Sequence, residues 1–549
     1  MKKKWIFFLF ALLTGLILSG QNQPNTYWVK LTDKKGTSYQ IDRPEKFLSQ
    51  RSINRRIKQH IAIDETDLPV SPVYLDSLRK LGLEVVHNSK WLNGATVRTS
   101  DTALIRKIAA LPFVTSVQLT RPANVLKSAK SKFNRNVSDE NFDPDDYGTA
   151  LGQLTQLKGQ YLHNLGYRGK GIHVAVLDAG FLNVNQHAAF DSLRLKNRLL
   201  GTRDFVNPKS NIYQEDRHGL SVLSCMAGKL PGKLVGTAPD ASYYLFRTEQ
   251  DTSEYLVEED NWVAAAELAD SLGVDVINSS LGYTVFDDPA MNHTYADLNG
   301  KTTRVTQGAN MAFRKGILVF SSAGNEGAVS NPWKWIVAPS DGENVIAAGA
   351  VDKNGARAYF SSYGPAYGGA IKPNVVATGL FTYVVTRDGS MGYDSGTSFS
   401  SPVLAGMAAC LLQANPGANV KQIKNAIEQS AHQHGNPDSI LGYGIPDFEK
   451  ADNYLKVNIA NNLKAQKEWI VSPNPFSDYL LIQNMNPVSA DNCLINIYNL
   501  QGILLWESAF KNTEQILLNN LDHLPNGFLV LSIRSGGKED RFKLIKTGR

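Results

Sequence analysis

Cysteine is scarce in this chain of 549 residues, which contains three: Cys225, Cys410 and Cys493. So few thiols exclude a disulfide-dense framework, and no C-x-x-C pair or cysteine–histidine cluster indicates a zinc or iron–sulfur site. We expect these thiols to be buried and to pack as small apolar residues. A calcium-binding loop of the D-x-D-x-D-G type is also missing, so the sequence specifies no metal site.

Long apolar runs are nearly as scarce, and the one candidate lies at the start of the chain. A basic segment, residues 2–4, precedes an apolar run over residues 5–18, and the small residues Ser19 and Gly20 follow. The run is shorter than the ~20 residues of a membrane-spanning helix. This pattern predicts a secretory signal peptide at residues 1–20, with an uncleaved anchor as the alternative. We therefore expect a secreted or outer-surface protein whose mature chain has no membrane-spanning segment.

Charge of one sign is not in large excess, because the net charge is only +6. Residues 1–20 carry +3, residues 21–125 carry 16 basic against 9 acidic side chains, and residues 146–549 sum to −4. The positive charge thus belongs to the front of the chain. We expect no nucleic-acid partner, and a mature protein that is mildly acidic.

The front of the chain has the pattern of a small α+β unit over residues 21–125. Residues 126–146 are polar and charged with little to bury, which indicates an exposed linker that proteases could cut. In the first unit we expect strands at 27–31, 83–86 and 113–118 and helices at 47–59, 73–81 and 102–110.

Residues 147–457 alternate short apolar strands with helical patterns, which is typical of an α/β fold with a mostly parallel sheet covered by helices on both faces. Residues 458–549 change to short strand-like runs between turn residues, which favours a small antiparallel β-sandwich. In the middle part we expect strands at 173–177, 242–246, 274–278, 318–321 and 345–350 and helices at 261–272 and 307–315.

Four segments of the middle part carry residues suited to nucleophilic catalysis. Asp178 ends the apolar strand of V-A-V-L-D, at the sheet edge where α/β proteins form their sites. His218 begins a helical pattern in D-R-H-G-L-S, and Asn325 lies between glycines in S-S-A-G-N-E-G. Ser398 lies in G-T-S-F-S-S-P. Because Pro402 is tolerated only in a first helical turn, we expect Ser398 at a helix N-terminus, where negative charge is stabilised.

Each of these residues alone has a simpler explanation. Asp178 could cap a helix, His218 could be structural, Asn325 could be a turn residue, and Ser398 or Ser400 could be a helix N-cap. Together they supply a nucleophile, a base, a carboxylate that orients the base, and a donor for an oxyanion. Their order along the chain differs from that of α/β-hydrolases and of the chymotrypsin fold and matches the subtilisin order.

On these segments, most of residues 147–455 resemble the subtilisin-like serine proteases, the subtilases. The resemblance implies that Asp178, His218 and Ser398 form the catalytic triad and that Asn325 is the oxyanion-hole donor. It also implies a substrate-binding strand and a pocket for the residue before the scissile bond, formed by Ser280, Leu281, Gly282, Ser322, Ala323 and Gly324.

The chain departs from the family pattern at two places. Ala179 follows the catalytic aspartate where Thr or Ser is usual, and Leu220 and Ser221 stand where the family has Thr and His. No replaced residue has a triad role, so we expect activity with altered local hydrogen bonding. The reaction needs no cofactor. Calcium is common in the family, but carboxylates such as Asp287 and Asp288 are expected to be solvated, so structural calcium stays open.

The two flanking parts carry resemblances of their own. Residues 21–125 resemble a subtilase propeptide, which assists folding and inhibits the enzyme until cleavage within residues 122–146; a permanent N-terminal domain is the alternative. The segment Ser472–Phe476 (S-P-N-P-F) and the later runs I-N-I-Y-N-L-Q-G and L-P-N-G-F-L-V-L resemble a Bacteroidetes type IX secretion-sorting domain. The secretion machinery is then a partner, and a substrate- or carbohydrate-binding sandwich is the alternative.

The function predicted on this basis is a secreted serine endopeptidase that cleaves proteins and peptides through an acyl-enzyme and is made as a self-processed zymogen. The alternative is a catalytically silent subtilase fold that serves as a surface adhesion or binding module. A basic propeptide on an acidic catalytic domain also suggests that electrostatic attraction assists inhibition, which high salt would weaken. The cleavage preference depends on loops around residues 251–262 and 283–306, whose shape the sequence does not give.

Overall fold

The computed structural model describes residues 24–123, 147–465, 469–484, 492–511 and 515–548. The chain divides into two compact units, residues 1–455 and 456–549. The expected signal peptide (1–20) and linker (126–146) lie outside the described residues. Within the described part, no helix combines the length and hydrophobicity that a membrane crossing requires.

The core of the larger unit is a seven-stranded sheet with the order β13-β12-β11-β10-β5-β9-β6. Every neighbouring pair in it is parallel. This confirms the predicted α/β fold with a parallel sheet. Its strands are β5 (His173–Asp178), β6 (Leu199–Asp204), β9 (Ser242–Arg247), β10 (Val276–Ser279), β11 (Leu318–Ser322), β12 (Ile346–Val351) and β13 (Val375–Thr378).

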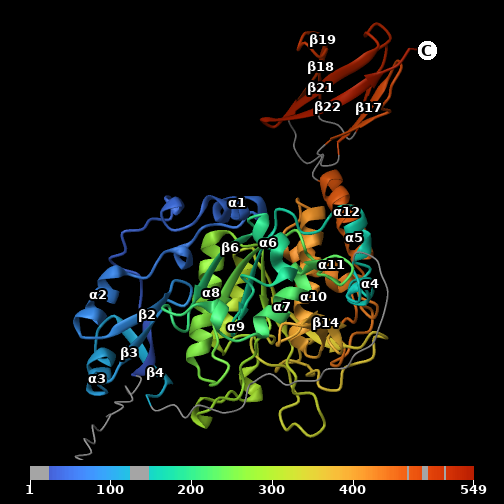
Figure 1. Ribbon diagram of the computed structural model, residues 1–549. Coiled ribbons are helices and arrows are strands. Elements are labelled where there is room, and N and C mark those ends of the chain that lie inside the picture. Colours follow the sequence, from blue (N-terminus) through green and yellow to red (C-terminus); the bar gives the residue numbers. More distant parts are fainter. Residues whose placement is uncertain (1–23, 124–146, 466–468, 485–491, 512–514, 549) are drawn as a thin grey trace, which may run out of the picture. The chain divides into compact units, whose positions relative to one another are not determined.

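Helices cover both faces of this sheet (Figure 1). Helices α7 (His218–Ala227) and α10 (Thr397–Ala414) pack on one face, and α8 (Val257–Leu272) and α9 (Arg304–Arg314) pack on the other. Helix α10 is buried from Thr397 to Leu412, as expected for a helix that is apolar on all sides. On the other face, Trp262 of α8 is fully buried and donates from Nε1 to Ser279 Oγ at 2.9 Å.

Smaller elements complete this unit. They are α4 (Leu151–Thr155), α5 (Gln160–Asn164), α6 (Asp191–Leu195), α11 (Val420–Ser430), the short pair β7 (Lys229–Leu230) and β8 (Leu234–Val235), and the hairpin β14 (Thr382–Val385) and β15 (Met391–Asp394). Helix α12 (Phe448–Ala465) begins in this unit and continues beyond Leu455, its last residue. The three cysteines are buried and free, as expected.

The N-terminal region forms an antiparallel sheet of its own with the order β2-β3-β1-β4. Two helices contribute apolar residues to the core of this region. Trp28 and Trp91 do not belong to this core but pack into the apolar core that includes residues of α8 and α9. A further helix, α1, contacts α8. The elements are β1 (Asn25–Leu31), α1 (Gln50–Gln59), α2 (Pro72–Lys80), β2 (Glu84–Ser89), β3 (Gly94–Thr99), α3 (Ala103–Ala109) and β4 (Val114–Arg121).

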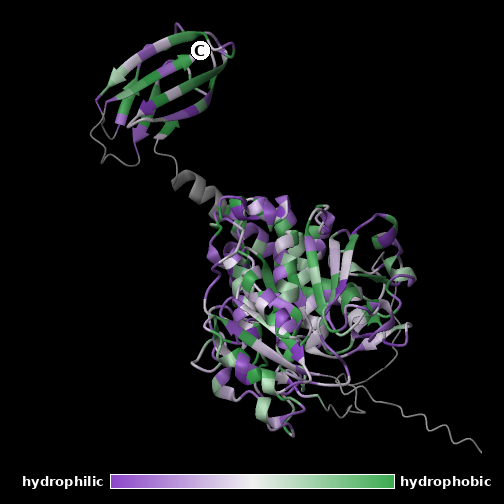
Figure 2. Ribbon diagram, turned by 90° about the vertical axis from the view of Figure 1, so that its left-hand side faces the viewer, coloured by the Kyte–Doolittle hydropathy of each residue, from purple (hydrophilic) through white to green (hydrophobic). Residues whose placement is uncertain are grey.

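The smaller unit consists of two antiparallel sheets, β16-β17-β20 and β19-β18-β21-β22, whose inner residues share one apolar core. Hydrophobic and hydrophilic residues alternate along its strands (Figure 2), as a sheet with one buried face requires. The predicted β-sandwich is therefore confirmed. Its strands are β16 (Trp469–Ser472), β17 (Leu480–Asn484), β18 (Cys493–Tyr498), β19 (Leu504–Phe510), β20 (Gln515–Leu518), β21 (Gly527–Ser535) and β22 (Lys538–Lys546).

The ring of His163 is buried in the larger unit and makes two hydrogen-bond contacts. Nδ1 of His163 lies 2.9 Å from the hydroxyl of Tyr147, and Nε2 lies 2.9 Å from the carbonyl of Thr237. A neutral ring satisfies both contacts, because one nitrogen accepts while the other donates. Burial lowers the pKa of His163 from 6.5 to about 4.

We predict that the free energy of unfolding falls as the pH is lowered from about 6.5 to about 4. In this window His163 is protonated in the unfolded chain and stays neutral in the folded chain. The folded state therefore loses about 3 kcal/mol of stability over the whole window. Urea denaturation at several pH values between these limits measures the slope. The substitution His163→Gln should make the slope shallower, and an unchanged slope would contradict the assignment.

Candidate active site

The parallel sheet brings three of the predicted residues to one edge. In the register of the sheet, Ser279 at the end of β10 pairs with Leu177 of β5 and with Ser321 of β11. The residues that follow these partners therefore emerge side by side. Asp178 ends β5, Ser280 follows β10, and Asn325 lies three residues beyond the end of β11.

Asp178 and His218 form a buried pair at this edge. Nδ1 of His218 lies 2.8 Å from Oδ1 of Asp178, and both side chains are almost fully buried. Because an ionised carboxylate only accepts hydrogen bonds, Nδ1 carries the proton in this contact. Nε2 of a neutral His218 is then the acceptor, as a general base requires. His218 is the first residue of α7, and its N–H donates to Asp216 Oδ1 at 2.7 Å.

The glycine beside His218 is required by a close approach. A Cβ on Gly219 would lie 2.3 Å from the carbonyl oxygen of Gly180. The absence of this side chain lets the start of α7 press against the turn that follows Asp178, as the sequence suggested. The distance between the aspartate and the histidine depends on this contact.

Ser398 is the second residue of α10, and Pro402 is its sixth. The expectation that Pro402 lies in the first helical turn is therefore wrong. Proline has no N–H, so the carbonyl of Ser398, four residues earlier, loses its helical donor. The hydroxyl of Ser280 donates to this carbonyl instead, at 2.8 Å. Ser280 thus fixes the backbone of Ser398 from the neighbouring strand.

The serines at the start of α10 are not helix caps. The N-cap position is Gly396, which makes no side-chain cap. The hydroxyl of Ser400 donates to the carbonyl of Thr397 at 3.0 Å, within its own helix. The hydroxyl of Ser398 faces the strand, 3.4 Å from the carbonyl of Ser280. The N-cap explanation therefore holds for neither Ser398 nor Ser400.

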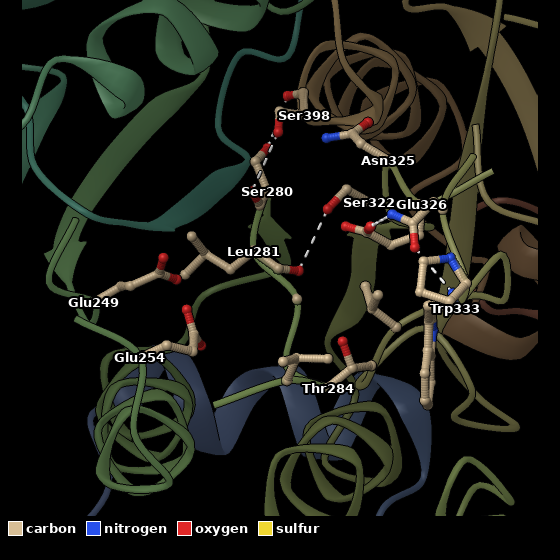
Figure 3. Close-up of a pocket in the computed structure, with 16 residues that line it drawn as sticks. Glu249, Glu254, Ser280, Leu281, Thr284, Ser322, Asn325, Glu326, Trp333 and Ser398 are labelled. Carbon is tan, nitrogen blue, oxygen red and sulfur yellow. Dashed lines mark hydrogen bonds between the residues drawn. The ribbon is translucent and has the colours of Figure 1, made fainter. Parts of the chain in front are cut away.

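The side-chain amide of Asn325 has a fixed orientation. Its Oδ1 accepts from the N–H of Thr397 at 2.9 Å and from the hydroxyl of Thr397 at 3.0 Å. Since a backbone N–H can only donate, these bonds assign the oxygen, and the Nδ2 group is left to face the cleft beside Ser398 (Figure 3). The amide can donate there to an oxyanion.

Two hollows meet at these residues. One, of about 330 Å³, is lined by His218, Asn325 and Ser398 together. The other, of about 420 Å³, is lined by Ser398 and Asn325 and by five of the six predicted substrate-binding residues: Ser280, Leu281, Gly282, Ser322 and Gly324. Ala323 does not line it. This residue is fully buried, and its N–H donates to the carbonyl of Ala348 at 2.9 Å.

Several residues of the larger hollow were missed by the sequence analysis. Three carboxylates line it, on Glu249, Glu254 and Glu326, and no lining residue is basic. Figure 3 shows Glu249 and Glu254 on one side of the segment with Ser280 and Leu281, and Glu326 on the other. Of these three carboxylates, only Glu326 could have been found from the sequence, because it directly follows Asn325. The other two belong to the stretch around residues 251–262 or directly precede it.

The base of the larger hollow is partly filled by Val337. A Cβ on Gly282 would lie 2.1 Å from a methyl of Val337, and a Cβ on Gly324 would lie 3.0 Å from the other methyl. The valine side chain therefore sits between the two walls of the pocket, which limits its depth.

The departures from the family pattern coincide with buried atoms that lack partners. Among the described residues, Oδ2 of Asp178 and Oγ of Ser221 have no hydrogen-bond partner. Oδ1 of Asp178 also accepts from the N–H of Ala179 at 2.8 Å, but the methyl group of Ala179 offers the carboxylate no second donor. The effect of these departures on activity stays a prediction.

Two further carboxylates flank the pair of Asp178 and His218. Burial raises the pKa of Asp216, against the opposing bond from the N–H of His218. Burial likewise raises the pKa of Asp394, against a bond from the N–H of Ser395 and the charge of Arg387. Among the described residues, no group of three or more His, Cys, Asp or Glu side chains could hold a metal ion.

Comparisons with known proteins identify the family of this chain and of its flanking domains. The model of the subtilase family (Peptidase S8) matches residues 169–444. The Peptidase S8 propeptide domain of Bacteroidota matches residues 26–136, and the secretion system C-terminal sorting domain matches residues 471–547. The domain boundaries that were drawn from the sequence stay predictions.

Subtilisin NAT from Bacillus subtilis subsp. natto and subtilisin E from Bacillus subtilis (strain 168) are each 30% identical over 301 residues, which cover 54% of this chain and 70% of theirs. Among solved structures, the prenylagaramide maturation protease PagA is 24% identical over 54% of this chain and 98% of its own, with a TM-score of 0.43. The subtilase model spans half of the chain, and the two subtilisins are each 30% identical to it. The chain therefore belongs to the subtilase family and carries a propeptide domain and a secretion-sorting domain.

Proposed function

We propose that the protein is a secreted serine endopeptidase, made as a zymogen, in which Ser398 attacks the peptide bond. The observation that carries this proposal is the 2.8 Å contact between Asp178 and His218 beside a serine at a helix N-terminus, in one hollow with a fixed asparagine amide. The relatives that are named subtilisins support the same reaction.

In the reaction, Nε2 of His218 takes the proton of the Ser398 hydroxyl while the serine oxygen bonds to the scissile carbonyl carbon. Asp178 stabilises the imidazolium that forms. The carbonyl oxygen becomes an oxyanion, which accepts hydrogen bonds from Asn325 Nδ2 and from the N–H of Ser398. His218 then gives its proton to the leaving amine, and the acyl-enzyme remains on Ser398. Water, activated by His218 in the same way, releases the acid and restores the serine.

The substrate backbone would lie along Ser280–Gly282, whose strand borders the larger hollow. The three carboxylates of this hollow favour substrates with basic side chains near the scissile bond, and Val337 favours a small residue in the pocket that it fills. The first substrate would be the chain itself, cut within residues 122–146. This segment carries Lys127, Lys130, Lys132 and Arg135.

The flanking domains give the location and the form in which the enzyme is made. The sorting domain supports export to the cell surface or beyond, with the segment 1–20 as the signal peptide. The propeptide domain supports synthesis as a precursor in which residues 21–125 assist folding and inhibit the enzyme.

The substitution Ser398→Ala is the direct test of this function. We predict that the variant stays uncut between residues 122 and 146 and does not hydrolyse casein, while the wild-type precursor does both. Gel electrophoresis of the purified precursors and a casein assay measure the two outcomes. If the variant cuts its own linker or digests casein as fast as the wild type, Ser398 is not the nucleophile.

Ser280→Ala tests the contact that replaces the missing helical bond of Pro402. We predict that this variant loses kcat about tenfold or more, because the carbonyl of Ser398 is left without its donor and the nucleophile loses its position. KM should change little, because the backbone that pairs with the substrate is kept. The control is Ser400→Ala, which removes another buried hydroxyl, from the helix that carries Ser398. Equal losses in both variants would show a general packing effect instead.

A further inference from the structure

The two hollows that meet at the proposed nucleophile differ in charge. The larger hollow is lined by three carboxylates, on Glu249, Glu254 and Glu326, and by no basic side chain. The smaller hollow shares Glu326 but has Asp394 and Arg387 in place of the other two carboxylates. Arg387 lies in the turn between β14 and β15. One hollow is therefore acidic throughout, and the other contains an arginine.

Glu249 and Glu254 form one wall of the larger hollow, which we call the acidic wall. Figure 3 shows both on one side of the segment with Ser280 and Leu281. The backbone of Glu254 is held by Asp287 on both sides. Its N–H donates to Asp287 Oδ2 at 3.1 Å, and its carbonyl accepts from the N–H of Asp287 at 2.9 Å. Since Glu249 is only 3% exposed, the fold sets the place of both carboxylates in the cleft.

Negative charge accumulates behind the acidic wall. The hydroxyl of Tyr283 is buried there and has no hydrogen-bond partner among the described residues. Burial raises the pKa of Tyr283 well above its usual value, and the charges of Glu249 and Glu258 raise it further. Glu258 is also buried, and its Oε1 accepts from the N–H of Gln250 at 2.8 Å. A cationic side chain bound at this wall would offset charges that burial makes costly.

The pocket against Val337 leaves little room for a long cationic side chain. The methyl groups of Val337 lie between Gly282 and Gly324, and the hydroxyl of Ser322 joins the two walls by donating to the carbonyl of Leu281 at 3.3 Å. In the proposed function this pocket takes the residue directly before the scissile bond. That residue is then small, and a basic side chain at the acidic wall belongs to a residue further upstream.

The arginine of the smaller hollow acts on the other part of the substrate. In the proposed reaction His218 protonates the leaving amine, so the residues after the scissile bond lie in the hollow that His218 lines. Burial lowers the pKa of Arg387, and the charges of Asp216 and Asp394 oppose this shift. A guanidinium stays charged in proteins. Arg387 therefore repels a basic side chain that follows the scissile bond and attracts an acidic one.

The linker of this chain has two halves of opposite charge. Its first half, residues 127–135, carries no acidic side chain and four basic ones: Lys127, Lys130, Lys132 and Arg135. Its second half, residues 139–146, carries no basic side chain and five acidic ones: Asp139, Glu140, Asp143, Asp145 and Asp146. The three residues between the halves, N-V-S at 136–138, are uncharged. The charges of the linker thus follow the order that the two hollows favour.

Only one placement of the linker avoids like charges in both hollows. A cut within residues 127–135 would bring lysines or Arg135 into the hollow of Arg387, and a cut within residues 139–146 would bring carboxylates to the acidic wall. A cut between residues 136 and 139 avoids both. If Ser138 precedes the bond, its small side chain fits against Val337. Arg135 then lies three residues upstream, about 10 Å away in an extended chain.

We propose that the enzyme makes the first cut in its own chain at this charge boundary, between Ser138 and Asp139. Arg135 then binds at the acidic wall, and Asp139 enters the hollow of Arg387. Other substrates share these features: a lysine or arginine a few residues before the bond, a small residue directly before it and an acidic residue after it. The match to the propeptide domain ends at residue 136, which agrees with this boundary. The inference rests on the proposed function, because it names the substrates of the same site.

The first test maps the earliest cut of the full chain. Samples of the folding wild-type precursor are stopped at short times, and the new N-terminus is identified by mass spectrometry. We expect Asp139 as this N-terminus. A first cut within residues 127–135 or within residues 139–146 would overturn the inference. The position of the cut tests the inference, whereas its loss in Ser398→Ala tests the proposed function, so the two failures are distinguishable.

The second test removes single charges from the linker and from the cleft. Arg135→Gln should slow the cut about tenfold, because a charge-assisted contact is lost, while Lys127→Gln, eight residues further upstream, should not. Glu254→Gln should also slow the cut, but should add little to the effect of Arg135→Gln. The control Asp288→Asn removes a carboxylate that does not line the hollow and should leave the rate unchanged. Equal rates for the two linker variants, or fully additive losses for Arg135→Gln and Glu254→Gln, would contradict the inference.

A peptide with the sequence of residues 133–142 answers the question if folding, and not the cut, limits these rates. The mature protein, freed of its N-terminal domain by added protease, should cut this peptide after Ser138. Its kcat/KM should be about tenfold higher than for the same peptide with Arg135→Gln. The mature Ser398→Ala protein should bind the first peptide about tenfold more tightly than the second in a fluorescence polarisation assay. Equal affinities would overturn the inference even if Ser398 is not the nucleophile.

Discussion

The contact between Ser280 and Ser398 joins the segment that follows β10 and borders the larger hollow to helix α10, which carries the proposed nucleophile. It exists because Pro402 cannot donate the hydrogen bond that would otherwise hold the carbonyl of Ser398 within α10. The hydroxyl of Ser280 takes this place at 2.8 Å. If the carbonyl of Ser398 accepted a hydrogen bond within α10, it would not need the bond from Ser280 that links the helix to the end of β10. Here one hydrogen bond links the proposed nucleophile to the segment proposed to bind the substrate backbone.

Helix α8 reaches from the residues near the larger hollow to the N-terminal domain. It starts at Val257, shortly after Glu254, which lines the larger hollow, and ends at Leu272. In its last turn, the carbonyl of Ser271 accepts from the N–H of Ser49 at the start of α1. A helix of this length extends about 24 Å. Its first turn contains Glu258, Glu259 and Asp260, which suit the positive end of the helix dipole. In its last turn, Asp270 pairs with Arg55 and Arg56. The N-terminal domain therefore contacts a helix whose other end follows closely after Glu254, which lines the larger hollow.

Much of the fold and the site could be predicted from the sequence. The strand of Asp178 and that of Leu318–Ser321 were placed within one residue of their bounds, because buried parallel strands are short continuous apolar runs. The edge strands β6 and β13 were missed: β6 is mostly exposed or half-buried and has a weak apolar signal, and β13, although fully buried, has only four residues. The start of α8 was placed at Asn261, four residues late, because its acidic first turn hides the apolar period.

The remaining errors concern contacts between distant residues. Pro402 was placed in the first turn by a local rule, but the bond from Ser280, 118 residues away, allows it in the second. Ala323 was included in the pocket because its neighbours in the chain line it, whereas alternation along β11 and beyond turns its side chain into the core. The contacts of α1 with Gly273, Val274 and Gly316 could not be predicted, because the acceptors are backbone carbonyls, which every residue has.

The central claim is that His218 activates Ser398 as a nucleophile. The most direct measurement is the reaction of the mature protein, freed of its N-terminal domain by added protease, with a fluorophosphonate, followed by mapping of the labelled peptide by mass spectrometry. The account predicts a label on Ser398 alone, and none when His218→Ala is treated in the same way. A folded wild-type protein that stays unlabelled, or that is labelled at another serine, would contradict it.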